Sequence, residues 1–152
     1  MHNTASLDAL RLPKGITVLL RVDFNVNIRN GRIEDDFRVK RSLPTIVELQ
    51  KRGFRIVLLT HLEKDTHTPT LRTLARLLRN YAPLKDMTYV AGTDRRNIRR
   101  RLADKTRRIV LLENTRRFLG EKANDAGLSR FFASLGRALH PVADSLLWRP
   151  AL

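Results

Sequence analysis

Three apolar segments of this chain end in polar side chains, and this pattern constrains the fold more than any other feature. The segments cover residues 18–22, 55–60 and 108–112. Strands that are buried in a parallel sheet read as continuous apolar runs, and ligands gather outside their carboxyl ends. The polar side chains that follow the three segments are Asp23 and Asn25, then His61, and then Asn114 and Arg116. We therefore expect core strands that deliver polar groups to one edge of a sheet.

Helical patterns alternate with these segments along the chain. We expect strands at residues 16–22, 55–60, 87–90 and 108–113, with helices after Asp36, over 71–81, over 95–104 and after Asp125. Asn30-Gly31 predicts a tight turn between two short strands. Pro44 near the start of the first helix is expected to bend it, and Gly53 is placed as its C-terminal stop. The alternation predicts an α/β fold with a parallel sheet.

Charge narrows the class of ligand. The 152 residues are enough for one domain, and 30 Lys and Arg against 15 Asp and Glu leave a formal net charge of +15. This balance favours an anionic ligand, although arginines spread over solvated surfaces would explain it equally well. There is no cysteine and no apolar run of membrane-spanning length. The four histidines show no metal-ligand spacing, and a cytoplasmic protein without a bound metal is the expectation.

The polar strand ends should converge, because the carboxyl ends of parallel strands lie on one edge. Arg38, at the start of the first helix, is expected to join them. Two guanidinium groups, an imidazole, an amide and a carboxylate suit a small anion that carries both a carboxylate and a phosphate, since Arg binds either in a bidentate manner. Each residue taken alone is equally well explained as an ordinary turn or loop residue.

The chain resembles the N-terminal domain of phosphoglycerate kinase at these residues. The matching stretches begin with residues 20–26 (LRVDFNV), 31–38 (GRIEDDFR), 42–46 (SLPTI) and 57–62 (VLLTHL). They continue with residues 110–116 (VLLENTR) and 120–125 (GEKAND), in the order and spacing of the family. The resemblance covers roughly residues 5–136 and implies a Rossmann-like, three-layer α/β domain, the N-terminal half of a two-domain enzyme.

The resemblance also implies a reaction and a set of site residues. The family transfers a phosphoryl group between ATP and 3-phosphoglycerate with Mg²⁺, and its second domain, absent from this chain, holds the nucleotide. Asp23 and Asn25 would bind the hydroxyl and carboxyl side of 3-phosphoglycerate or 1,3-bisphosphoglycerate. His61 and Arg116 would hold its anionic end. Arg38 would be the catalytic group that neutralises the transferring phosphoryl group.

Two departures from the family pattern lie beside the expected site. Where the family reads His-Leu-Gly-Arg-Pro, this chain reads His61-Leu-Glu-Lys-Asp65. Lys64 keeps a positive charge for the substrate but loses the guanidinium fork. Glu63 replaces a glycine and brings a negative charge to an anion site, which should weaken binding.

A third departure is the tail at residues 137–152, which does not align with the family. A domain at 1–136 followed by an unmatched tail is therefore expected, with the last part of the sheet missing and one edge exposed. One hypothesis for the tail is a frameshift near codon 137, and an evolved short protein is the alternative. We expect a monomer without kinase turnover of its own.

Two other functions compete with the kinase interpretation. Residues 94–108 hold eight basic residues in fifteen, which is compatible with a nucleic-acid-binding module. Few aromatics interleave there, and Ile98 and Leu102 form an i, i+4 pair that would simply dock a helix, so a solvated face is favoured. The other alternative is a non-functional truncated remnant of the kinase.

Overall fold

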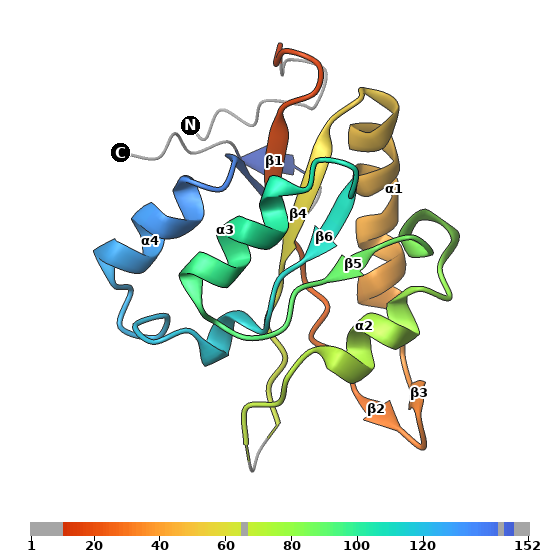
Figure 1. Ribbon diagram of the computed structural model, residues 1–152. Coiled ribbons are helices and arrows are strands. Elements are labelled where there is room, and N and C mark those ends of the chain that lie inside the picture. Colours follow the sequence, from red (N-terminus) through yellow and green to blue (C-terminus); the bar gives the residue numbers. More distant parts are fainter. Residues whose placement is uncertain (1–10, 65–66, 143–144, 148–152) are drawn as a thin grey trace.

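The central element is a sheet whose strands run mostly parallel (Figure 1). The computed structural model describes residues 11–64, 67–142 and 145–147. Its main strands are β1 (Thr17–Arg21), β4 (Arg55–Leu59), β5 (Thr88–Tyr89), β6 (Ile109–Leu111), β7 (Arg137–Val142) and β8 (Ser145–Leu147). They lie in the order β5-β6-β4-β1-β7-β8, and only β8 runs antiparallel to its neighbour. The predicted α/β class with a parallel sheet is confirmed.

The three strands that were expected to carry the site lie side by side. β4 is paired with β1 on one side and with β6 on the other. Arg21 at the end of β1 lies opposite Leu59, and Leu58 lies opposite Leu111 at the end of β6. The carboxyl ends of all three strands therefore stop at the same level, and the residues that follow them start from one edge.

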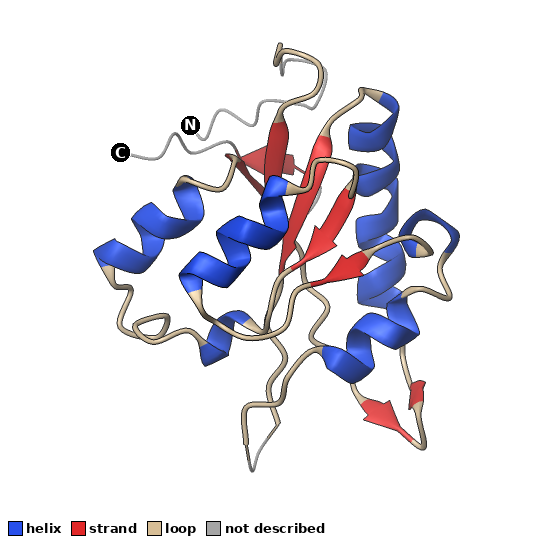
Figure 2. Ribbon diagram, viewed as in Figure 1, coloured by secondary structure: helices blue, strands red, loops and turns tan. Residues whose placement is uncertain are grey.

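Helices cover both faces of this sheet, which makes three layers (Figure 2). α1 (Phe37–Lys51) and α2 (Arg72–Leu78) lie on one face, with the 3-10 turn η2 (Ala82–Leu84) after them. α3 (Arg95–Ala103) and α4 (Ala126–Ala133) lie on the other. In the described part of the chain, no helix is long and apolar enough to cross a membrane.

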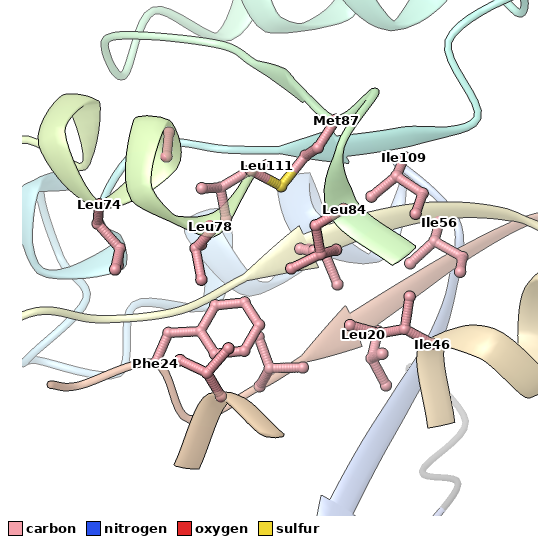
Figure 3. Packing of buried hydrophobic residues seen from close by; sticks show 14 of the residues in the cluster. Leu20, Phe24, Ile46, Ile56, Leu74, Leu78, Leu84, Met87, Ile109 and Leu111 are labelled. Atoms are coloured by element: carbon pink, nitrogen blue, oxygen red, sulfur yellow. The ribbon is translucent and has the colours of Figure 1, made fainter. Parts of the chain in front are cut away.

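Alternate side chains of the strands supply two separate cores. Val18 and Leu20 of β1 pack with α1 and α2, whereas Leu19 between them packs with α3 and α4. Figure 3 shows part of the first core, in which Leu20 and Ile46 lie side by side and Leu78 belongs to the same buried cluster. Strands that are buried on both faces need apolar residues at every position, and this explains the unbroken apolar runs in the sequence.

Local signals place several element boundaries where the sequence predicted them. Asn30 and Gly31 both have positive φ, and they join β2 (Ile28–Arg29) to the antiparallel β3 (Arg32–Ile33). The side chain of Asp94 accepts a hydrogen bond from the backbone N–H of Asn97 (2.7 Å) and so caps α3. Asp125 caps α4 in the same way through Leu128 (2.7 Å).

The first two helices differ in detail from expectation. Pro44 lies in the middle of α1 rather than near its start, and the helix continues on both sides of it. α2 ends at Leu78, so the prediction that Tyr81 lies on this helix is wrong. Tyr81 instead donates a hydrogen bond from its hydroxyl to Asp36 (2.9 Å) and thereby links η2 to the start of α1. The position of Tyr81 fits the apolar spacing of a helix, but its ring lies after the helix and its hydroxyl is used to bind Asp36.

The outer edge of β1 is occupied rather than open. Arg137–Leu139 of β7 pairs in parallel with Val18–Leu20, and this corrects the expectation of an exposed edge and a missing neighbour strand there. Gly136 makes the approach possible, because a Cβ at this residue would stand 2.7 Å from the carbonyl oxygen of Thr17. Residues 137–139 therefore pair with the edge of β1 that was expected to be open.

A buried arginine ties the start of β4 to the end of α3. Arg55 is 2% exposed, and its guanidinium donates to the carbonyl oxygens of Leu102 (2.7 Å), Asp104 (2.8 Å) and Arg107 (2.8 Å). The last carbonyl groups of a helix lack partners within the helix. Arg55 provides hydrogen bonds to the carbonyl of Leu102 and to two carbonyls of the following loop, so its role is to hold the fold together.

Glu113 performs the equivalent task at the carboxyl edge. It is 1% exposed, and its carboxylate accepts hydrogen bonds from the Tyr89 hydroxyl (2.6 Å) and from the backbone N–H groups of Leu71 (2.9 Å), Gly92 (3.1 Å) and Asn114 (2.8 Å). Burial alone would raise the pKa of Glu113, but these four donors outweigh it and lower the pKa. Burial and the bond to Glu113 also raise the pKa of Tyr89.

Replacing Glu113 by Gln should destabilise the fold, because an amide has one acceptor oxygen and turns its own donors toward groups that now donate to the carboxylate. In the better amide orientation one N–H group still faces a donor, and we expect a loss of about 1–3 kcal/mol in the free energy of unfolding, measured by urea denaturation at pH 7. Since the pKa of Glu113 is lowered in the folded protein, its contribution is complete above the ordinary value of 4.5 and is lost as the pH falls below it. An equally stable Gln variant would contradict the assignment.

Candidate functional site

The segments that follow β1, β4 and β6 stay bonded to one another beyond the last paired residues. Val22 N–H donates to the carbonyl of Leu59 (2.9 Å), and Phe24 N–H donates to the hydroxyl oxygen of Thr60 (3.0 Å). The carbonyl of Thr60 in turn accepts from Thr115 N–H (3.1 Å). Thr60 therefore joins all three strand ends, and the loops that carry the predicted site residues leave the sheet as one assembly.

Asp23 and Arg38 form the first contact of the site. Nη1 of Arg38 lies 3.2 Å from Oδ1 and 2.9 Å from Oδ2 of Asp23, and both side chains are about half exposed. Arg38 occupies the first turn of α1, which starts at the carboxyl edge of the sheet. The Asp23 carboxylate also accepts a bond from Asn25 N–H (3.1 Å), so it fixes both the loop and the guanidinium.

Asn25 connects this pair to the loop after β4. Its side-chain oxygen accepts a hydrogen bond from the backbone N–H of Glu63 (3.2 Å). The bond involves only the main chain at residue 63, so any non-proline residue there could make it. The amide of Asn25 thus holds residue 63 beside the end of β1.

Arg116 lies between two carboxylates. It belongs to the 3-10 turn η3 (Thr115–Arg117), and its Nη1 donates to Oε2 of Glu121 (2.9 Å). Oε1 of Glu63 lies 3.0 Å from its Nε. The geometry at Nε does not meet that of a hydrogen bond, so the Glu63 contact is a close ion pair and the Nε–H has no hydrogen-bond acceptor among the described residues.

Glu121 reaches Arg116 because of a tight turn. Gly120 has φ +90, and a Cβ at this residue would lie 2.6 Å from the Cβ of Asp125. Only glycine combines that backbone conformation with the close approach. The turn at 120–125 thus presents Glu121 to Arg116 and Asp125 to the start of α4.

The charged side chains at both ends of the site, Asp23 and Arg116, lie close enough to His61 to shift its pKa. Partial burial lowers the pKa of His61, and the positive charges of Arg116 and Arg21 lower it further, while Asp23 and Glu63 act in the opposite direction. The pKa of His61 therefore lies below the ordinary 6.5, which favours the neutral imidazole at pH 7. A neutral imidazole can donate one hydrogen bond to an anion without adding charge.

Lys64 and Asn114, which also follow strands, differ in their contacts. Lys64 is partly buried, and nothing within the described ranges forms a hydrogen bond or an ion pair with its amine. Asn114 is fully buried and bonds to Leu62 N–H (3.2 Å), Leu62 O (2.7 Å) and Pro69 O (2.8 Å). Asn114 therefore shapes the loop after β4 rather than facing a ligand.

The arginine-rich segment lies on a different part of the molecule. Ile98 and Leu102 of α3 are buried against the sheet, as the docked-helix interpretation predicts. The guanidinium carbons of Arg95 and Arg99 each lie 5.1 Å from the centre of the Phe131 ring in α4. These two arginines contribute to packing between the helices.

The site thus forms a connected series from Arg38 through Asp23, Asn25 and Glu63 to Arg116. Sequence reasoning named Asp23, Asn25, Arg38, His61, Lys64 and Arg116 from strand ends and family motifs. It missed Glu121 as a partner of Arg116, because nothing in the run Gly120-Glu-Lys-Ala-Asn-Asp125 indicates where the carboxylate points. Groups of three or more side chains suited to hold a metal ion are not found in the described part of the chain.

Comparison with known proteins identifies the family. The sequence model of the family described as phosphoglycerate kinase matches residues 7–145. The chain belongs to the phosphoglycerate kinase family. The matched range extends past residue 136 and includes β7, where our motif comparison found no correspondence.

Individual relatives agree with this assignment. The chain is 38% identical over 120 residues to phosphoglycerate kinase of Rubrobacter xylanophilus, covering 74% of this chain and 29% of that protein. It is 37% identical over 132 residues to the Thermus thermophilus protein, covering 83% and 33%. The solved phosphoglycerate kinase of Pyrococcus horikoshii superposes with a TM-score of 0.76 at 25% identity, over 90% of this chain and 36% of that one. The chain therefore spans about a third of the length of its curated relatives.

The electrostatic position of His61 can be tested by titration. Replacing Arg116 by Gln should raise the pKa of His61, because a neighbouring positive charge is removed, and replacing Asp23 by Asn should lower it. NMR of the imidazole resonances across pH 4–8 measures both shifts. Replacing Arg107 by Gln, a charge change on the loop before β6, serves as the control. Shifts of the opposite sign would contradict the arrangement.

Proposed function

We propose that this chain binds 3-phosphoglycerate, or its acyl phosphate 1,3-bisphosphoglycerate, as the substrate-binding part of a phosphoglycerate kinase. The observation that carries the proposal is the meeting of Asp23, Arg38, His61 and Arg116 at the joined ends of β1, β4 and β6. Membership of the family supports the same substrate. The family membership gives no support to the nucleic-acid alternative, and part of the α3 charge is already engaged in packing.

Each side chain has a role that suits its chemistry. The Asp23 carboxylate can accept a hydrogen bond from the substrate hydroxyl, and the amide of Asn25 can donate to the carboxyl side. His61 and Arg116 hold the anionic end, with the ammonium of Lys64 free to join them. Arg forks match phosphate and carboxylate geometry, so Arg116 supplies direction as well as charge.

Arg38 is the catalytic residue of this proposal. Its Nη1 is engaged by Asp23, whereas Nε and Nη2 make no hydrogen bond within the described ranges and remain for a ligand. Phosphoryl transfer depends on positioning and on neutralising charge that develops on the transferring group. Arg38 fulfils that requirement once Asp23 has oriented it.

The nucleotide belongs to another part of the enzyme. The family resemblance places ATP and its Mg²⁺ in the second domain, and the described residues offer no cluster of metal ligands. A glycolytic role in the cytoplasm, as a monomer, completes the proposal.

Substrate binding can be measured by calorimetry with 3-phosphoglycerate. Replacing Arg38 by Met should lower the affinity about tenfold or more, because a charge-assisted hydrogen bond to the ligand is lost. Replacing Arg107 by Met removes the same charge from an exposed pair with Asp104, and it should leave the affinity unchanged. If both changes lowered the affinity equally, binding would depend on the overall positive charge and not on a specific contact of Arg38.

Catalysis by the isolated chain can be tested in a coupled assay with ATP and 3-phosphoglycerate. We expect binding without turnover, since the residues that hold the nucleotide in the family are not among those identified here. Turnover that disappears when Arg38 is changed to Met would contradict this expectation and would require a nucleotide site in this chain.

A further inference from the structure

The loop after β4 carries a carboxylate that faces the arginine of the proposed site. Oε1 of Glu63 lies 3.0 Å from Nε of Arg116, with side-chain exposures of 48% and 26%. An anionic oxygen this close to a guanidinium has the charge and the distance of a bound ligand oxygen, although it does not form the hydrogen bond that a ligand could form. The pair therefore holds, inside one chain, the type of contact that a substrate anion would make.

The position of Glu63 is imposed by the backbone rather than by the ion pair. The main-chain N–H of residue 63 is bonded to Asn25 (3.2 Å), and the residue before it, Leu62, is held by Asn114 through both main-chain groups. The side chain of residue 63 thus projects beside Arg116 whether or not it is charged. Removing the carboxylate should leave the loop in place.

Arg116 retains binding capacity that Glu63 does not use. Its Nε is buried and lacks a hydrogen-bond acceptor among the described residues, although the Glu63 oxygen is near. Its Nη1 is bonded to Glu121, whose side chain is only 14% exposed and is held by the turn at Gly120. Glu121 is therefore part of the frame, whereas the half-exposed Glu63 is the group that an incoming anion can displace.

We propose that Glu63 is an internal competitor for the anion seat at Arg116, and that it sets how strongly this site binds phosphorylated acids. The proposal rests on the proposed function for the identity of the substrate, but the competition itself concerns any small anion at Arg116. With Glu63 present, a phosphate or carboxylate must break the ion pair and also approach a like charge. Without it, the buried Nε–H is open to the ligand.

The experiment uses inorganic phosphate as the probe and the Nε–H resonance of Arg116 as the readout, assigned by its loss in Arg116→Lys. In Glu63→Gln, phosphate should shift this resonance at about fivefold lower concentration than in the wild type, which is the effect of removing one partly exposed ion pair. Glu63→Gly should behave in the same way. It provides a second variant in case the Gln side chain makes a new bond to Arg116.

The matched control is Glu48→Gln. Glu48 in the last turn of α1 contacts the Nε of Arg52, the residue that follows the helix (2.8 Å), and is 40% exposed, so its loss changes the net charge equally and breaks a similar pair. The proposal is overturned if both Glu63 variants bind phosphate like the wild type. It is also overturned if Glu48→Gln strengthens binding equally, because the effect would then be that of overall charge.

Calorimetry with 3-phosphoglycerate separates this proposal from the assignment of function. Tighter binding of both phosphate and 3-phosphoglycerate by the Glu63 variants supports both proposals. Tighter binding of phosphate alone, with 3-phosphoglycerate failing to bind any variant, supports the competition and overturns the proposed substrate.

Discussion

The buried carboxylate of Glu113 is the interaction on which the carboxyl edge of the sheet depends. Its four donors come from β5, from the loops that start α2 and α3, and from its own neighbour Asn114. A carboxylate is costly to bury unless its oxygens are bonded, and here the bonds outweigh the cost. The loop of His61 can then rest on Asn114, which is positioned next to this carboxylate. The geometry of the site therefore depends on Glu113, a buried residue that has no role in the proposed binding.

The two arginines of the proposed site are each paired with carboxylates, although the chain as a whole carries a large excess of positive charge. The formal net charge is +15, yet Arg38 is paired with Asp23, and Arg116 is paired with Glu63 and Glu121. These pairs orient the guanidinium groups and hold them against the repulsion of neighbouring cations. They also reduce the potential that an arriving anion experiences. The same contacts thus favour precise positioning and oppose tight binding.

Much of the fold follows from patterns of short range. Unbroken apolar runs, Asn30-Gly31 and the caps at Asp94 and Asp125 predicted strands, a turn and helix starts, because each depends on residues close in sequence. The convergence of Asp23, His61 and Arg116 followed from one topological rule about parallel strands. Bonds across long separations could not be predicted: Arg55 with the end of α3, Tyr81 with Asp36, and β7 beside β1. The β7 pairing uses main-chain groups, which carry no mark in the side-chain sequence.

Position 63 shows how scaffold and affinity can be separated within one residue. Its backbone N–H contributes to the loop by bonding to Asn25, and this bond is available to glycine and glutamate alike. Its side chain forms an ion pair with Arg116 and also opposes the lowering of the His61 pKa. The glutamate that replaces the family's glycine can therefore alter the electrostatics of the anion seat while the path of the main chain is preserved. Under the proposed competition, a carboxylate at this position lowers the affinity of the anion site without changing the main-chain bond that holds the loop.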